Sequence, residues 1–153
     1  MKRFFLLFAL TALSQLIFAQ TDSMRADTKE MLKEHAKNDH VILDWSWSLK
    51  KSSTISIEIS FMNPYEKDIK AIWFTFSAFD AKGKPVKDLK TGKTITVIES
   101  KRLHTANGGY IDYKFEKVFN AKTVDEMRAE EVKLEFTDNT TKIIKGSKAV
   151  GEP

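Results

Sequence analysis

The stretch Ile69–Val86, IKAIWFTFSAFDAKGKPV, carries the clearest indication of the fold of this chain. Apolar side chains recur at every second position, and in an extended chain they share one face: Ile72, Phe74, Phe76 and Ala78. Trp73 falls on the other face, and a turn containing Gly83 ends the stretch before Pro85. The pattern predicts the central strand of a β-sandwich, with its large apolar groups turned inward.

The same alternation precedes this stretch in two further runs. The first, residues 43–49, is predicted to turn four apolar side chains inward: Leu43, Trp45, Trp47 and Leu49. The second, residues 55–61, carries an apolar side chain at every second position, and residues 51–53 join the two runs as a hairpin. Asn63-Pro64-Tyr65 follows as a turn, because its proline has no N–H to offer a sheet ladder.

Short alternating segments follow the central strand, separated by turn signals. We expect strands in residues 86–89, 94–99, 111–115, 132–136 and 142–144. A single helical turn is predicted over Thr123–Arg128. Seven or eight short strands without regular strand–helix alternation favour an all-β, immunoglobulin-like antiparallel β-sandwich with a short N-terminal helix.

The predicted organisation has four parts. Residues 1–19 form a signal peptide, residues 20–40 an N-terminal helix and linker, residues 41–146 the β-sandwich domain, and residues 147–153 a flexible tail. The helix is predicted because apolar side chains recur at helical spacing in its sequence, Met31 and Leu32 among them. Its apolar stripe is thin, so the helix is either lightly docked on the domain or frayed.

The first 19 residues have the parts of a secretory signal. Lys2 and Arg3 form the charged start, residues 4–13 are apolar, and Ala19 is a small residue at the expected cleavage point. The apolar segment is shorter than the roughly 20 residues that a membrane-spanning helix needs. We therefore expect a secreted or periplasmic protein without stable membrane insertion.

Composition argues against several functions. The chain has no cysteine and therefore no disulfide, thiol nucleophile or cysteine metal site. Without Lys2 and Arg3, 23 basic residues stand against 21 acidic ones, a balance that argues against a nucleic-acid partner. His35, His40 and His104 lack metal-ligand spacing, and no nucleophile elbow or phosphate-binding loop occurs. We expect no enzyme, no cofactor and no metal.

Phe76-Ser77-Ala78-Phe79-Asp80 resembles the F-x-L-Y-D signature of a family of immunoglobulin-like domains in secreted bacterial proteins. Residues 81–86 resemble the turn that this family uses. Ala78 stands where the pattern has Leu, and Phe79 stands where it has Tyr. The resemblance covers about ten of the 153 residues. It implies a secreted immunoglobulin-like sandwich that serves as an interaction module, without active-site residues to carry over.

Two groups of residues are candidate partner-binding sites. Trp73 and Tyr65 would serve a glycan, because the C–H face of a sugar packs on a flat aromatic ring. Lys82, Lys84 and Lys87 begin a basic stretch that would suit an anionic partner. The alternative role of these lysines is to protect an edge hairpin from edge-to-edge association. The alternative for Trp73 is a position beneath the N-terminal helix.

The sequence therefore predicts a secreted, non-enzymatic immunoglobulin-like interaction module that binds a protein or an envelope component. The alternative is a carbohydrate-binding module that uses exposed aromatic side chains. The third hypothesis is an enzyme whose site forms only in three dimensions, which a closed pocket with converging carboxylates would indicate.

Overall fold

A computed structural model describes residues 25–100 and 105–150 of the chain. The predicted signal peptide, Ala19 and His104 lie outside these residues. Residues 25–38 are helical, and no helix in the described part is long and apolar enough to cross a membrane. The chain divides into two compact units, Met1–Glu34 and His35–Pro153, and the strands belong to the second.

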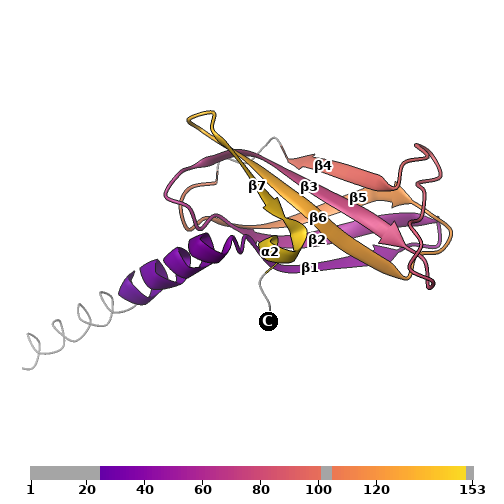
Figure 1. Ribbon diagram of the computed structural model, residues 1–153, viewed down its shortest axis with the longest axis horizontal. Coiled ribbons are helices and arrows are strands. Elements are labelled where there is room, and N and C mark those ends of the chain that lie inside the picture. Colours follow the sequence, from indigo (N-terminus) through magenta and orange to yellow (C-terminus); the bar gives the residue numbers. More distant parts are fainter. Residues whose placement is uncertain (1–24, 101–104, 151–153) are drawn as a thin grey trace, which may run out of the picture. The chain divides into compact units, whose positions relative to one another are not determined.

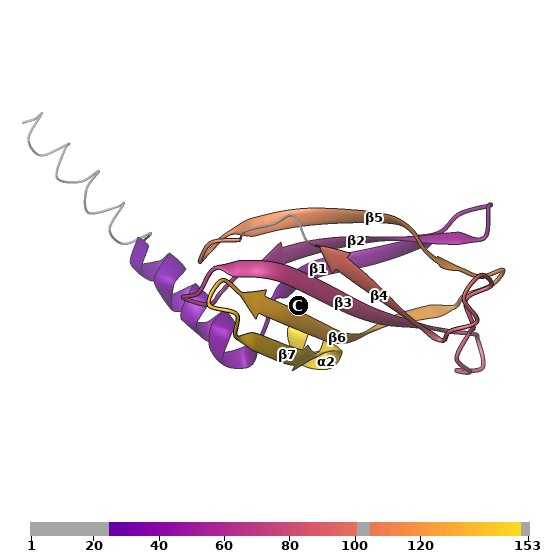
Figure 2. The same cartoon turned by 90° about the horizontal axis from the view of Figure 1, so that it is seen from above.

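Seven strands form a β-sandwich in the described part of the chain (Figure 1). In chain order they are β1 (Ile42–Leu49), β2 (Thr54–Met62), β3 (Ile69–Phe79), β4 (Ile95–Ser100), β5 (Tyr110–Asn120), β6 (Glu126–Phe136) and β7 (Thr141–Lys145). They make a three-stranded sheet, β1-β2-β5, and a four-stranded sheet, β4-β3-β6-β7, with antiparallel pairing throughout. Figure 2 shows the two sheets as stacked layers. The predicted immunoglobulin-like sandwich is confirmed.

The core lies between the two sheets, whose interior strands are β2 on one side and β3 and β6 on the other. The inward side chains of β3 are fully buried, as the alternation predicted: Ile72, Phe74, Phe76 and Ala78. The ring of Phe61 on β2 meets the ring of Phe74 edge-on, with 6.2 Å between their centroids. Burial of apolar surface stabilises the fold by about 25 cal/mol per Å², so this double layer of side chains is the main stabilising feature.

Strand β1 departs from the predicted register at its start. A bulge between Ile42 and Asp44 shifts its pairing with β2, and an extra residue at a bulge changes which face a side chain occupies. Leu43 is consequently 40% exposed, and the prediction that it points into the core is wrong. Leu49 stays on the inner face opposite Ile55, but it is 36% exposed at the end of this edge strand, so its predicted burial is also wrong. Trp45 and Trp47 do pack against the core, partly buried.

Two predicted elements between the strands are replaced by loops. Residues 86–89 form no strand, because their backbone N–H groups donate to three different segments: Val86 to Ala78, Asp88 to Lys93 and Leu89 to Asn120. Residues 123–125 form no helical turn, since the backbone of Asp125 donates to Phe79 and β6 begins directly at Glu126. Both predictions are wrong, because backbone hydrogen bonds to segments distant in sequence set the conformation of these residues.

Residues 146–150, which follow β7, pack against the domain. Gly146–Ala149 form a helical turn, α2, in which Ala149 is fully buried. The carbonyl of Ala149 accepts a hydrogen bond from the backbone N–H of Val41 at 3.0 Å, and Val150 forms a bridge to Ile42. The predicted flexible tail is therefore wrong for residues 147–150, because these residues pack beside the start of β1.

Trp45 offers a test of the β1 register. Its ring packs on Phe76, with 5.3 Å between centroids. We expect Trp45→Ala to lower the free energy of unfolding by about 2–4 kcal/mol, slightly less than for a fully buried aromatic residue. Exposed Ser46→Ala should change it by less than about 0.5 kcal/mol. Denaturant melts of both variants measure the difference, and equal losses would contradict the register.

Gly146 occupies a position where a larger residue does not fit. A Cβ at this position would lie 1.7 Å from the carbonyl oxygen of Ala129, a backbone atom of β6. We expect Gly146→Ala to lower the free energy of unfolding by about 1–3 kcal/mol through overpacking. The control is the adjacent exposed Ser147→Ala, which thermal melts should show to be nearly neutral. A neutral Gly146→Ala variant would contradict the close approach of α2 to β6.

Candidate functional site: the lysine-rich end

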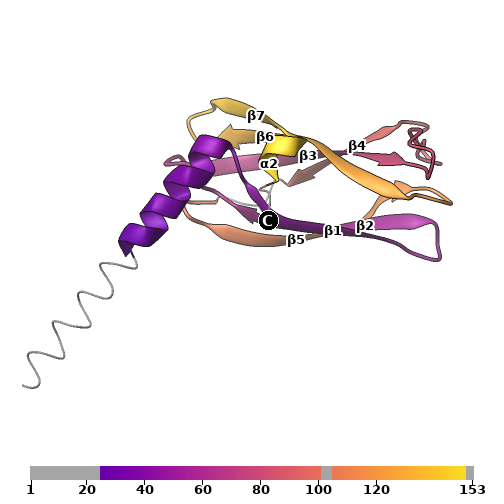
Figure 3. The ribbon, with the colours of Figure 1, turned by 60° about the horizontal axis from the view of Figure 1, so that its bottom comes forward.

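Three loops from distant parts of the sequence meet at one end of the sandwich. They are residues 50–53 between β1 and β2, residues 80–94 between β3 and β4, and residues 121–125 between β5 and β6. The backbone N–H of Leu89 donates to Asn120 at 2.8 Å, and that of Ala121 donates to Ser53 at 2.9 Å. Figure 3 shows the three loops gathered at the same end of the two sheets.

These loops carry a strong excess of positive charge. They contain three aspartates and eight exposed lysines: Lys50, Lys51, Lys82, Lys84, Lys87, Lys90, Lys93 and Lys122. Their formal charge is thus +5, larger than the +4 of the whole chain. We call this surface the lysine-rich end.

Two of the three aspartates bind the backbone of their own loop. One oxygen of Asp80 accepts the N–H groups of Lys82 and Lys84, at 2.8 and 2.9 Å. Asp88, only 5% exposed, accepts the backbone N–H groups of Lys90 at 2.9 Å and Thr91 at 2.7 Å through one oxygen. The side-chain charges of the lysines therefore remain available to a partner. Within the described residues, Lys50 pairs with Glu116, whereas the other seven lysines make no ion pair.

Asp88 also anchors the long loop to the end of β5. Its second oxygen accepts the backbone N–H of Asn120 at 2.6 Å and the side-chain amide of the same residue at 3.1 Å. Burial by itself raises the pKa of Asp88, but hydrogen bonds from Thr91 and Asn120 outweigh it and lower the pKa to about 2. The ionised carboxylate is thus a positioning group that fixes the lysine-bearing loop on the sandwich.

The three lysines singled out in the sequence lie together at this end. Lys82 and Lys84 line a shallow cleft of about 360 Å³ whose other wall comes from the β5–β6 loop, including Thr123 and Asp125. Lys87 is exposed further along the same loop. Lys84 lies in a short hairpin in which Pro85 forms a bridge to Phe79 of β3, so protection of this edge stays the alternative role of the lysines.

Sequence reasoning did not connect Lys51 and Lys122 with this group. They lie in other loops, roughly thirty and forty residues from Lys82 and Lys84. The predicted strand order could have connected them. Successive antiparallel strands run in opposite directions, so every second connection lies at the same end of the sandwich. The first, third and fifth connections of the sandwich follow this rule.

Trp73 lies elsewhere, on the outer face of the four-stranded sheet. It is partly buried, opposite Glu99 on β4 and Lys133 on β6. The ammonium group of Lys133 stands 4.8 Å from the centroid of the indole ring, a cation–π geometry worth about 0.5–1 kcal/mol at an exposed site. Trp73 therefore has a polar partner within its own sheet, and its cover by the N-terminal helix stays a prediction.

Tyr65 lies in the β2–β3 turn, at the other end of the sandwich. Its hydroxyl donates to Asp39 at 3.0 Å, its ring meets Phe136 edge-on, and the Lys142 ammonium stands 4.6 Å from the ring centroid. Burial, and then the carboxylate of Asp39, raise the pKa of Tyr65. These contacts tie the linker before β1 to the turn, which gives Tyr65 a structural role.

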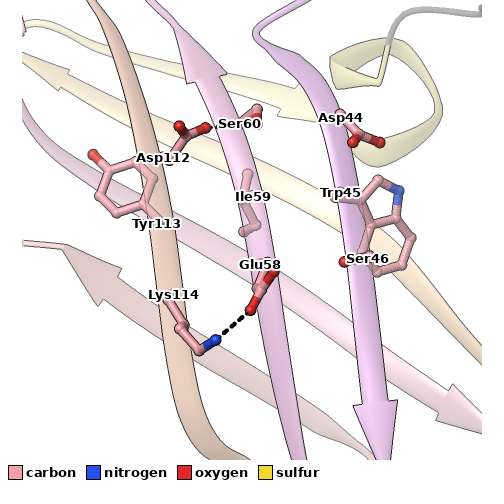
Figure 4. A pocket seen from close by; sticks show the side chains of 9 residues that line it. All are labelled: Asp44, Trp45, Ser46, Glu58, Ile59, Ser60, Asp112, Tyr113 and Lys114. Carbon is pink, nitrogen blue, oxygen red and sulfur yellow. Dashed lines mark hydrogen bonds and ion pairs between the residues drawn. The ribbon is translucent and has the colours of Figure 1, made fainter.

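A shallow hollow of about 350 Å³ on the outer face of the three-stranded sheet is a second candidate site (Figure 4). Its polar side chains already bind one another: Ser60 donates to Asp112 at 2.7 Å, and Lys114 pairs with Glu58 at 2.6 Å. Figure 4 shows Asp44 and Asp112 on the two outer strands with β2 between them. The hollow therefore does not present converging carboxylates.

The hydroxyls of Tyr110 and Ser60 lower the pKa of Asp112 in this hollow, which keeps the carboxylate ionised and unsuited to act as a general acid. No group of three or more acidic or histidine side chains that could hold a metal ion occurs in residues 25–100 and 105–150. No family model, curated protein or solved structure matches the chain.

The lowered pKa of Asp88 predicts that the free energy of unfolding depends on pH in the acid range. Its pKa is lowered from the ordinary 3.8 to about 2, so the stability it contributes is fully present above pH 3.8 and is lost as the pH falls through about 2. Asp88→Asn places an NH₂ group against N–H donors and should lower the free energy of unfolding by about 2–3 kcal/mol at neutral pH. Urea melts from neutral to acid pH measure both effects.

Asp80→Asn is the matched control, because both N–H groups reach a single oxygen that the amide retains. It should remain close to the unsubstituted protein at neutral pH. Equal losses for the two variants would show that Asp88 is not the anchor of the loop.

Proposed function

We propose that this protein is a secreted, non-enzymatic immunoglobulin-like interaction module that binds an anionic component of the cell envelope through its lysine-rich end. One observation carries the proposal. Seven exposed lysines without an ion pair among the described residues gather on three loops, while Asp80 and Asp88 bind the backbone.

The chemistry of these lysines suits a repeating anionic partner. A lysine ammonium is a compact charge on a flexible stem, so it adapts to phosphates or carboxylates of variable spacing. The clustered charges attract such a partner from a distance, and added salt weakens that attraction. Loops held on a rigid sandwich are a common place for binding residues. The short resemblance to secreted immunoglobulin-like domains supports the same class of function.

The alternative, a carbohydrate-binding module built on aromatic rings, receives less support from the geometry. Trp73 and Tyr65 lie on different parts of the sandwich, and a lysine ammonium stands over each ring. A platform for a neutral sugar needs a free, flat aromatic face. We therefore place the binding surface at the lysine-rich end.

The test compares two triple substitutions that remove the same charge. Lys82→Gln, Lys84→Gln and Lys87→Gln together should weaken binding to a phosphorylated polysaccharide by roughly a hundredfold, at about 1 kcal/mol per lysine. The control carries Lys29→Gln, Lys33→Gln and Lys37→Gln, three exposed positions of the helical segment 25–38. Titration by light-scattering or interferometry measures the affinity.

Binding of the unsubstituted protein should fall with added salt and should disappear for the dephosphorylated polysaccharide. Equal losses for the two triple variants would mean that net charge alone matters. Binding that survives both the loop substitutions and high salt would contradict the proposed function.

A further inference from the structure

Three large apolar side chains are exposed at the lysine-rich end. Leu89, in the loop between β3 and β4, is 60% exposed. Leu49, the last residue of β1, is 36% exposed, and Ile95, the first residue of β4, is 48% exposed. Figure 2 shows that β1 ends and β4 begins at the end of the sandwich where these loops gather. The same end therefore presents both positive charge and apolar surface.

Leu89 lies in a tight turn whose backbone is held on both sides. The N–H of Gly92 donates to the carbonyl of Asp88, and the N–H of Asp88 donates to the carbonyl of Lys93, both at 2.8 Å. The N–H of Leu89 itself donates to the carbonyl of Asn120, at the end of β5. The turn is thus anchored to the sandwich, and it presents the leucine side chain to solvent.

Unpaired lysines lie on both sides of this leucine in the sequence. Lys87 precedes it, Lys90 and Lys93 follow it, and all three are exposed. None of the three forms an ion pair within the described residues. Apolar side chains among basic ones are typical of segments that bind a membrane surface, where the apolar groups enter the boundary between headgroups and acyl chains.

We propose that the lysine-rich end docks on the surface of a bilayer that contains anionic phospholipids, with Leu89 entering the boundary between headgroups and acyl chains. This inference rests on the proposed function, because it names the anionic envelope component as phospholipid. The protein lies on the membrane surface without crossing it, held by its lysines and by a small apolar contact.

The apolar side chains favour a bilayer over a phosphorylated polysaccharide. Both partners offer phosphate groups, so the lysines alone do not distinguish them. A hydrated polysaccharide has no apolar phase that could remove Leu89 from water. A bilayer offers phosphates and acyl chains within about 5–10 Å of each other at its surface, and burial of apolar surface there is favourable.

The charge of this end suits an anionic leaflet. With their three aspartates included, the three loops carry a formal charge of +5. A basic side chain near an anionic membrane surface is attracted to it, and the attraction falls off within a Debye length. A lysine also lays its apolar stem along the acyl boundary while its ammonium group stays at the phosphates. The lysines and the exposed leucine therefore fit the same surface.

The first test removes the apolar side chain and keeps every charge. Leu89→Ser should weaken binding to vesicles of phosphatidylcholine and phosphatidylglycerol roughly tenfold, because apolar area buried at the membrane surface contributes to binding. The control is Ile143→Ser, since Ile143 on β7 is 61% exposed and lies outside the lysine-bearing loops. Cosedimentation with vesicles should show unchanged binding for the control, and circular dichroism should show both variants folded.

The same two variants distinguish lipid from polysaccharide. Neither Leu89→Ser nor Ile143→Ser should alter binding to the phosphorylated polysaccharide, because both keep all the lysines. Vesicles of phosphatidylcholine alone should bind the unsubstituted protein much more weakly than the anionic vesicles do, because they carry no net charge.

The second test reports the surroundings of the side chain at position 89. In Leu89→Trp, fluorescence should shift to shorter wavelength with the anionic vesicles, because the added indole leaves water. The phosphorylated polysaccharide should cause no such shift. Ile143→Trp is the matched control, and the vesicles should leave its spectrum unchanged.

The inference and the proposed function can fail separately. A protein that binds the polysaccharide through its lysines but does not bind anionic vesicles would overturn the inference and leave the proposed function intact. Equal vesicle affinities for Leu89→Ser and Ile143→Ser would overturn the inference in the same way. If Lys82→Gln, Lys84→Gln and Lys87→Gln together lose no affinity for either partner, the proposed function fails and the inference fails with it.

Discussion

The packing of the inner face of β3 against the inner face of β2 is the interaction on which the rest of the structure depends. Phe74 and Phe76 of β3, and Phe61 of β2, are fully buried between the sheets. The chain has no disulfide to hold the two layers together. The sheets therefore remain in contact because their apolar faces exclude water. This contact also brings the loops of the two sheets together at the ends of the sandwich.

The lysine-rich end shows how this scaffold positions polar groups. Three connections lie at one end because the strands they join are antiparallel and packed in two layers. Asp88, with four N–H groups around its carboxylate, then fixes the longest connection against β5. A buried, fully hydrogen-bonded carboxylate holds the loop, while the exposed lysines around it stay in solvent.

The surfaces of the sandwich differ in how many of their polar side chains form hydrogen bonds or ion pairs with one another. On the outer face of the three-stranded sheet, hydroxyls and opposite charges pair across the strands. At the β2–β3 turn, Tyr65, Asp39 and Lys142 form a closed set of contacts. Among the described residues, the lysine-rich end carries seven lysines without an ion pair, and the proposed function rests on them.

The alternation of Ile72, Phe74, Phe76 and Ala78 was enough to predict the sandwich and the inner face of β3, because an extended chain places every second side chain on one face. The sequence also placed Lys82, Lys84 and Lys87 in one basic loop. Two features depended on the fold as a whole: Leu43 turns outward, and Lys51 and Lys122 lie at the same end as that loop. A bulge depends on the partner strand, and proximity between loops depends on how the sheets stack. Neither property is local in the sequence.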